Sequence, residues 1–125
     1  MMPPLPSARQ KAERRGRLGE VLAALYLRLQ FYRILATRVK TPVGEIDLIA
    51  RRGRTVIFVE VKLRRNITSL GAALDAVNRR RISRAAQYFL TQRPKLTDYT
   101  LRFDVIFLAP FAWPRHVKGA FETLE

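Results

Sequence analysis

Two charged residues, Glu60 and Lys62, interrupt an otherwise apolar stretch, VIFVEVKLRR at residues 56–65. Alternate side chains of a strand share a face, so these two would project together, about 6.6 Å apart at the backbone. The apolar Ile57 and Val59 would then face the opposite way. A strand with an acid and a base on one face and an apolar opposite face can hold an ion pair or a chemical site.

Asp47 is the third charged residue that can join this pair. It lies in the preceding apolar segment, GEIDLIA at residues 44–50, and the turn sequence RRGR at residues 51–54 predicts that the two segments form a β-hairpin. A loop of two or four residues would place Asp47 opposite Phe58 and diagonal to Glu60, on the same face. An odd loop without a bulge would put Asp47 on the other face.

The chemistry depends on what holds two carboxylates together. Asp47 and Glu60 would repel each other and lose hydration unless a cation lay between them. Mg²⁺ typically binds one or two carboxylates together with waters and a substrate phosphate. Lys62 would then orient or deprotonate an attacking water, or neutralise charge on the phosphate. The alternative is an ion pair of Lys62 with either carboxylate, with no chemical role.

The apolar periodicity predicts the elements that position these residues. We expect a helix from about residue 9 to 29, strands near residues 33–40, 45–50 and 55–63, helical segments near 70–77 and 82–89, and a strand at 101–110. The two helical segments form either one bent helix or two, with Asn78 as a cap. The helical crossover predicts that the last two strands are parallel. The expected fold is therefore an α/β domain with a mixed sheet flanked by helices.

The first helix carries two apolar faces. Its leucine-rich stripe is predicted to be buried and consists of Leu18, Val21, Leu22, Leu25 and Leu29. Glu20 lies on the opposite side, among Gly16, Ala23, Ala24 and Leu27, and is either a surface carboxylate near the helix start or part of a site. Near the other end of the chain, Trp113 is expected to pack beside Pro110 and Pro114.

Two further acids have alternative roles. Glu45 shares a strand face with Asp47 and would be either an additional ligand or an exposed residue at a strand start. Asp104 lies in an apolar strand, and we expect it to form a structural hydrogen bond or a pair with Arg64 or Arg102, or else to lie near the site.

Composition and charge limit the class of protein. The 125 residues predict one domain, residues 9–125, after a proline-rich arm at residues 1–8. The chain has 24 Lys and Arg against 10 Asp and Glu, a net charge of +14, which favours nucleic acid as a partner over a merely solvated basic surface. The candidate phosphate contacts are Arg51, Arg52, Arg54, Arg64, Arg65, Arg79, Arg80, Arg81 and Arg84.

Other classes are excluded by what the sequence lacks. There is no cysteine, and the single histidine, His116, rules out a multi-histidine metal site. No export signal or stretch long enough to span a membrane is present, so we expect a cytoplasmic protein without a membrane partner.

Four motifs together resemble those of the YraN-like family of small bacterial proteins. They are GxxGE at residues 16–20, GEIDLIA at 44–50, FVEVKxR at 58–64 and RFDV at 102–105. That family is similar to archaeal Holliday junction resolvases of the PD-(D/E)xK nuclease superfamily. The resemblance implies a restriction-endonuclease-like core in the order α-β-β-β-α-β.

The resemblance also implies site residues and an activity. Asp47, Glu60 and Lys62 match the catalytic D, E and K positions, and Glu20 matches the helical acid that would join Asp47 and Glu60 in holding Mg²⁺ or Mn²⁺. The implied function is a resolvase-like endonuclease that hydrolyses branched or structured nucleic acid, DNA rather than RNA, as a homodimer. The alternative is a non-catalytic nucleic-acid-binding domain with the same fold.

Overall fold

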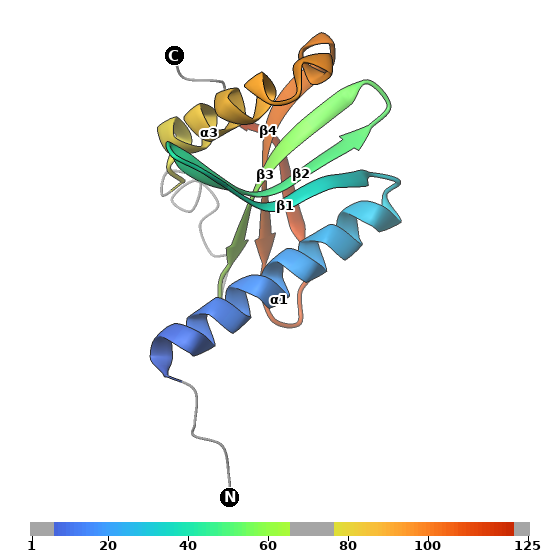
Figure 1. The fold of residues 1–125 in the computed structure, drawn as a ribbon. Coiled ribbons are helices and arrows are strands. Elements are labelled where there is room, and N and C mark those ends of the chain that lie inside the picture. The colour runs from blue at the N-terminus through green and yellow to red at the C-terminus, as the bar shows by residue number, and fades with distance from the viewer. Residues whose placement is uncertain (1–6, 66–76, 122–125) are drawn as a thin grey trace, which may run out of the picture.

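The computed structural model describes residues 7–65 and 77–121, which form two helices on opposite faces of one sheet (Figure 1). The elements are α1 (Ala8–Leu29), β1 (Arg33–Thr41), β2 (Gly44–Arg52), β3 (Thr55–Leu63), α3 (Arg79–Thr91), a 3₁₀ helix η1 (Pro94–Asp98), β4 (Thr100–Leu108) and β5 (Arg115–Phe121). This order confirms the expected α/β, nuclease-like core with a mixed sheet. Within the described residues, no helix is both long and apolar enough to cross a membrane.

The sheet has the strand order β1-β2-β3-β4-β5. β3 and β4 pair in parallel, as the helical crossover predicts, and the other neighbours are antiparallel. β5 was not expected, because its short, weakly alternating sequence follows a segment rich in proline and aromatic residues. It pairs with the outer edge of β4 and so covers a strand that would otherwise end the sheet.

The β2–β3 hairpin has a two-residue loop, Gly53 and Arg54, with Gly53 in the left-handed conformation that such turns favour. The even loop confirms that Asp47 lies on the same side as Glu60. The expected pairing of Asp47 with Phe58 is wrong, because Phe58 pairs with Ile49 instead. The register is therefore two residues further along, which brings Asp47 level with Glu60 rather than diagonal to it.

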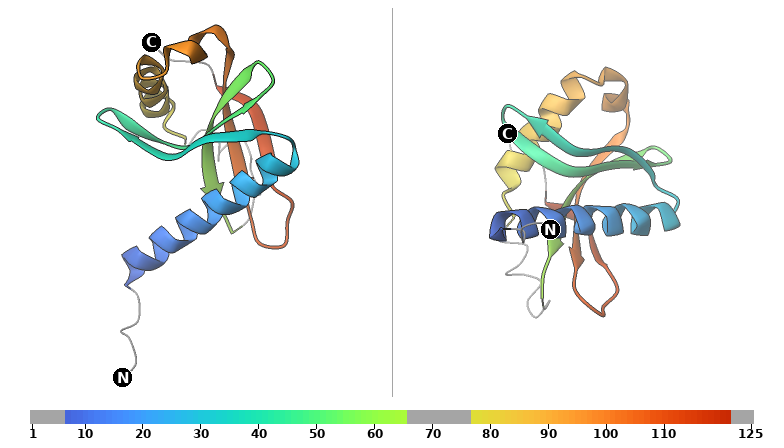
Figure 2. Two further views of the ribbon diagram at one scale, coloured as in Figure 1. Left: turned by 45° about the vertical axis from the view of Figure 1, so that its right-hand side comes forward. Right: turned by 60° about the horizontal axis from the view of Figure 1, so that its bottom comes forward.

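β2 and β3 separate at one end and form a fork. Their pairing stops at Leu48 and Val59, although β2 begins at Gly44 and β3 continues to Leu63. The start of β2 and the end of β1 swing away together from β3, while β3 continues beside β4 (Figures 1 and 2). We call the facing segments, residues 44–47 and 60–63, the fork. Backbone groups facing the fork need partners other than a neighbouring strand.

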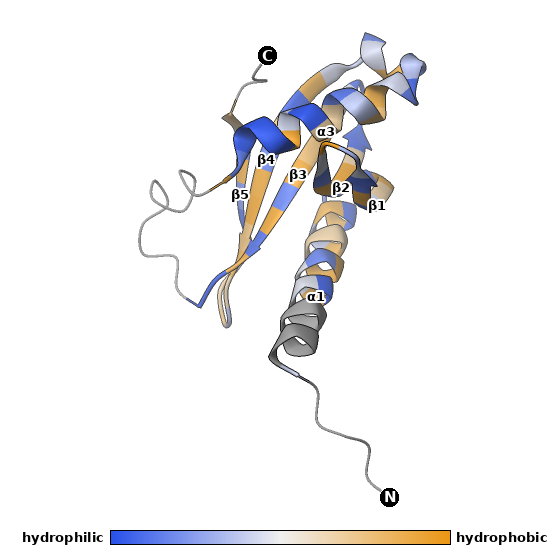
Figure 3. Ribbon diagram, turned by 60° about the vertical axis from the view of Figure 1, so that its left-hand side comes forward, coloured by the Kyte–Doolittle hydropathy of each residue, from blue (hydrophilic) through white to orange (hydrophobic). Residues whose placement is uncertain are grey.

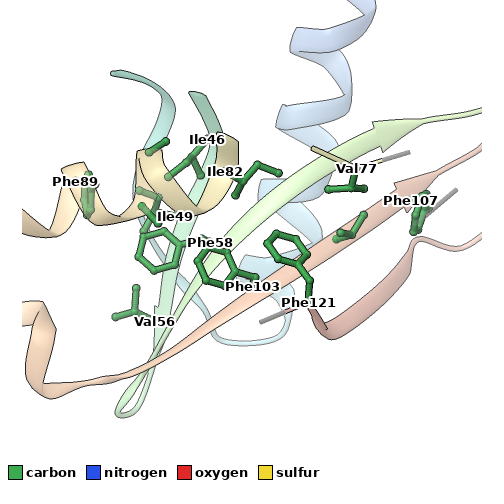
Figure 4. Packing of buried hydrophobic residues seen from close by; sticks show 13 residues of the cluster. Ile46, Ile49, Val56, Phe58, Val77, Ile82, Phe89, Phe103, Phe107 and Phe121 are labelled. Atoms are coloured by element: carbon green, nitrogen blue, oxygen red, sulfur yellow. The ribbon is translucent and has the colours of Figure 1, made fainter. Parts of the chain in front are cut away.

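Two apolar clusters fill the space between the sheet and the helices. The cluster under α3 includes Phe58, Phe89, Phe103 and Phe121, with ring contacts along the row (Figure 4). The cluster under α1 is formed by the following residues among others: Ala23, Leu27, Leu48, Ile57, Val59 and Ile106. These clusters confirm that successive residues of β3 face opposite layers.

The orientation of α1 corrects the sequence-based expectation. Gly19, Ala23 and Leu27 face the sheet, whereas Leu25 and Leu29 of the predicted buried stripe are more than half exposed. Apolar residues recur along α1 (Figure 3), and those exposed are Leu18, Val21, Leu22, Leu25 and Leu29. The small residues face the sheet because they let the helix approach it closely. A Cβ on Gly19 would already contact Val61. Trp113 was expected to be a packing residue but is 88% exposed.

The described end of the second helical region confirms Asn78 as a helix cap. Its side chain accepts a hydrogen bond from the Arg81 backbone amide at 3.2 Å, at the start of α3. The segment near residues 70–76 lies outside the described residues, as do residues 1–6 of the expected arm. Residue 8 of that arm already belongs to α1.

The prediction that Asp104 has a structural role is confirmed: its side chain is fully buried in β4. Arg102 donates two hydrogen bonds of 2.8 Å to its carboxylate, the Gly119 amide donates one at 3.0 Å, and the His116 Nε2 lies 2.7 Å away. Burial would raise the pKa of Asp104, but these hydrogen bonds outweigh burial and hold the pKa below its usual value. The contacts of Asp104 with His116 and Gly119 therefore link β5 to β4 on the α1 side of the sheet.

Candidate functional site

The fork brings Asp47, Glu60 and Lys62 together. The Asp47 Oδ2 accepts a hydrogen bond of 2.7 Å from the backbone amide of Val61, which has no strand partner on that side. The Lys62 Nζ lies 3.1 Å from the Glu60 Oε1, and both side chains are largely covered. One carboxylate thus bridges the fork, and the acid and base of β3 lie beside it.

Asp47 and Glu60 are close enough to influence each other's ionisation. Burial and the neighbouring Asp47 charge raise the pKa of Glu60 to about 7, against the opposing effect of Lys62. Burial also raises the pKa of Asp47, while the Val61 amide and Lys62 lower it. The pair therefore retains one proton to a higher pH than two separate, solvated carboxyl groups would.

A small pocket opens over these groups. It has a volume of about 220 Å³ and is lined by Glu45, Asp47, Glu60 and Lys62 from the fork, with Asn78, Arg81 and Ile82 from the start of α3. Glu45 is exposed at its mouth, and its charge contributes to raising the pKa of Asp47. The pocket is polar and open to solvent, and it adjoins the amino-terminal end of a helix, which favours anions.

Gly44 allows α3 to reach this position. A Cβ at Gly44 would lie 2.5 Å from the carbonyl oxygen of Arg81 and 2.7 Å from its Cγ. The backbone of the first turn of α3 therefore lies directly against the start of β2, three residues before Asp47. Because no side chain fits between them, Gly44 determines how closely Arg81 approaches the carboxylates.

We expect Gly44→Ala to destabilise the protein by about 1–3 kcal/mol, because the new methyl group must push back the first turn of α3. Urea denaturation measures this loss. Gly16→Ala is the matched control: nothing lies within 4 Å of a Cβ there, and alanine favours a helix, so it is expected to be neutral or stabilising. Equal effects of the two substitutions would contradict the close approach at Gly44.

Glu20 lies near the site but is engaged elsewhere. Its carboxylate forms an ion pair with Arg38 at 2.9 Å, which sequence analysis did not anticipate because nothing in the pattern of β1 distinguishes that arginine. Burial raises the pKa of Glu20 despite Arg38, and the charge of Asp47 adds to the rise. Glu20 and Asp47 are thus electrostatic neighbours. No group of three or more acids or histidines in residues 7–65 and 77–121 is already arranged to hold a metal ion.

The candidate arginines fall into two groups at opposite ends of β3. Arg51, Arg52 and Arg54 surround the hairpin loop, roughly 13–20 Å from Glu60 by the register of the hairpin and the rise of a strand. They contact Tyr99, Tyr32 and the backbone of Gln30 and Asp98, so they fasten the hairpin to neighbouring elements. The second group consists of Arg64 and Arg65, which follow β3, and of Arg79, Arg80, Arg81 and Arg84 in α3. Arg81 lines the pocket at the fork, whereas the Arg79 guanidinium lies over the ring of Phe121 in β5.

The raised pKa of Glu60 predicts a pH dependence of stability in the metal-free protein. The folded protein keeps this proton up to about pH 7, whereas a carboxyl with the ordinary pKa of 4.5 loses it earlier. The unfolding free energy should therefore fall as pH rises from about 4.5 to 7. Urea denaturation at pH 5 and pH 8 checks this, and Glu60→Gln should remove part of the decrease. Superimposable pH profiles of the two proteins would contradict the raised pKa of Glu60.

The order of elements, with acids and a lysine at a sheet fork, defines an α/β protein with a nuclease-like core. The chain belongs to the family described as "Uncharacterised protein family UPF0102", whose model matches residues 19–108, and this confirms the resemblance to the YraN-like family. The matched region contains both arms of the fork and the start of α3.

Relatives match over nearly the whole chain. A UPF0102 protein of Methylorubrum extorquens is 50% identical over 124 residues, which cover 98% of this chain and 97% of the relative. One from Mesorhizobium japonicum is 50% identical over 117 residues, covering 93% and 94%. One from Parvibaculum lavamentivorans is 46% identical over 115 residues, covering 92% and 86%.

Proposed function

We propose that this protein is a metal-dependent nuclease that hydrolyses phosphodiester bonds, with DNA as its substrate. The observation that carries the proposal is the half-buried carboxyl pair Asp47 and Glu60, which lies beside Lys62 in an open polar pocket and in which the pKa of Glu60 is raised. A protein gains no stability from holding two acids together in this way, whereas a cation-binding site requires it.

The carboxyl pair fits a magnesium or manganese ion by its donor set. Asp47 and Glu60 would hold Mg²⁺ or Mn²⁺, with Glu20 as a third acid nearby once it leaves Arg38. Two carboxylates with a substrate phosphate are a usual magnesium environment. When bound, the ion would polarise the phosphate and favour ionisation of water. Loss of the proton from Glu60 would accompany binding, because ligands must be deprotonated.

The chain's own cations would act on the substrate. Lys62, held beside Glu60, would orient the attacking water or balance the charge that develops on the phosphate. Arg81 reaches the same pocket from α3 and would hold the phosphate in place. The backbone of the nucleic acid would be contacted, without reading of its sequence, by Arg64 and Arg65 after β3 and by Arg79, Arg80 and Arg84 of α3.

The resemblance to resolvases favours branched or structured DNA over RNA, and a homodimer as the acting form. The test compares cleavage of a four-way junction, a flap, single-stranded DNA and duplex DNA of one sequence, with Mg²⁺, Mn²⁺ or EDTA. We expect metal-dependent cleavage that Lys62→Ala abolishes and Lys95→Ala, an exposed lysine of η1, preserves. Absence of cleavage, or equal cleavage by both variants, would remove the enzymatic proposal.

A second candidate is a nucleic-acid-binding domain without catalysis. It is favoured by the ion pairs Glu20–Arg38 and Glu60–Lys62, which neutralise two of the three proposed ligands. This function predicts salt-sensitive DNA binding that Glu60→Ala leaves unchanged. Titration calorimetry with Mn²⁺ separates the two candidates, since binding that Glu60→Ala removes supports the nuclease.

A further inference from the structure

An apolar groove runs along the outer side of α1, away from the proposed site. It has a volume of about 530 Å³ and is lined by Leu18, Leu22, Leu25 and Leu29 of α1 and by Pro110 and Trp113 of the β4–β5 loop. Leu18 and Leu29 span eleven residues of helix, or about 17 Å. The groove therefore has the length of about three turns of a second helix.

The groove is exposed because of how α1 meets the sheet. The small face of α1 packs inward, which leaves its leucines outside together with the nearly fully exposed Trp113. Exposed leucines that line one continuous groove, next to an exposed tryptophan, are unusual on a soluble surface and are typical of a protein interface.

The charges around the groove are positive. Arg17 and Arg28 are exposed on the flank of α1, beside Val21. Arg64 and Arg65 line a pocket that adjoins the groove at Pro110. Among the residues that the structure describes, no aspartate or glutamate lines the groove or this adjoining pocket. Glu20, on the Arg17 flank, is paired with Arg38.

The positive charges around the groove distinguish between two possible binding partners, a second copy of this chain and a helix of another protein. A second copy related by a two-fold axis would place the same patch against itself, with arginines near arginines and a charge of +14 on each chain. An amphipathic helix with an acidic polar face meets both requirements: its apolar stripe fits between α1 and Trp113, and its carboxylates face the arginines.

We propose that the groove between α1 and the β4–β5 loop binds an acidic amphipathic helix of another protein. The bound helix would lie on the α1 side of the sheet, whereas Glu60 and Lys62 face the α3 side, and the groove shares no lining residue with the pocket at the fork. This inference does not depend on nuclease activity. A homodimer would use a different surface.

The test uses three synthetic fluorescent helical peptides of fourteen residues and the full chain. One carries leucines at helical spacing i, i+3, i+4 and i+7 with glutamates on the other face; the second replaces the glutamates with lysines; the third has the first peptide's composition with the leucines scattered. Fluorescence anisotropy measures their binding. We expect the first peptide to bind at least tenfold more tightly than the others, and more weakly as salt rises.

Substitutions in the protein locate the binding. Leu25→Ser and Trp113→Ser should each weaken the acidic peptide about tenfold, while Leu101→Ser, at an exposed leucine of β4, should not. Arg17→Glu with Arg28→Glu should weaken the acidic peptide and favour the lysine peptide. Equal binding of the acidic and scattered peptides, or no effect of Leu25→Ser, would overturn the proposal. A dimer in sedimentation that Leu25→Ser dissociates would assign the groove to a second copy instead.

Discussion

Asp47→Asn is expected to lower metal-dependent DNA cleavage by on the order of 1,000-fold and to abolish Mn²⁺ binding. Asparagine keeps an oxygen that can accept the hydrogen bond of the Val61 amide, so the link between β2 and β3 across the fork should remain. It removes the negative charge that a divalent cation requires. Single-turnover cleavage of the preferred DNA and titration calorimetry with Mn²⁺ measure the two losses.

Asp98→Asn provides the matched control. Asp98 is an exposed carboxylate of η1, at the other end of β3 from the fork, so its loss should leave both cleavage and Mn²⁺ binding unchanged. Circular dichroism verifies that both variants fold. If Asp47→Asn binds Mn²⁺ as the wild type does, Asp47 is no ligand, and the carboxyl pair needs another explanation.

Asp104→Ala is expected to cost about 3–5 kcal/mol of unfolding free energy, the largest effect on stability predicted for this chain. The substitution removes a fully buried carboxylate that makes four hydrogen-bond contacts with three residues, Arg102, His116 and Gly119. Arg102 and the Gly119 amide would then lack their acceptor, and β5 would lose a link to β4. Urea denaturation at neutral pH measures the difference.

The control for this prediction is Asp98→Ala, which should change the unfolding free energy by less than about 0.5 kcal/mol, as surface substitutions usually do. A loss below about 1 kcal/mol for Asp104→Ala would contradict the structural role of the network. DNA cleavage should persist in Asp104→Ala at a temperature where it remains folded, because Asp104 does not line the pocket at the fork.

Helices α1 and α3, strands β1 to β4 and the shared face of Glu60 and Lys62 could be predicted because each depends on local sequence pattern, whereas β5 could not. The alternation of apolar and charged residues in β3 predicts that Glu60 and Lys62 face away from Ile57 and Val59. The turn sequence around Gly53 predicts the hairpin, whose loop is Gly53 and Arg54. The register was predicted two residues short, since alternation fixes which face a residue occupies but not which residue pairs with it. That difference makes Asp47 a neighbour of Glu60 rather than a diagonal contact.

The faces of α1 could not be ranked by hydrophobicity. Leu25 and Leu29 are more hydrophobic than Gly19 and Ala23, yet the smaller residues face the sheet. The decisive quantity is the distance between helix and sheet, a property of tertiary packing that the helix sequence does not contain. The Arg38 partner of Glu20 was missed for the same reason, because that contact depends on where β1 passes α1.

The bridge between Asp47 and Val61 makes one backbone amide a sensor of the site. Any ion or ligand that draws the Asp47 carboxylate toward itself competes with the Val61 N–H for the same oxygens. The chemical shift and the hydrogen-exchange rate of this single amide should therefore change on binding in 15N-labelled protein, without an engineered reporter group. A nuclear magnetic resonance titration of the Val61 signal would thus measure occupancy of the fork even in a variant that cleaves nothing.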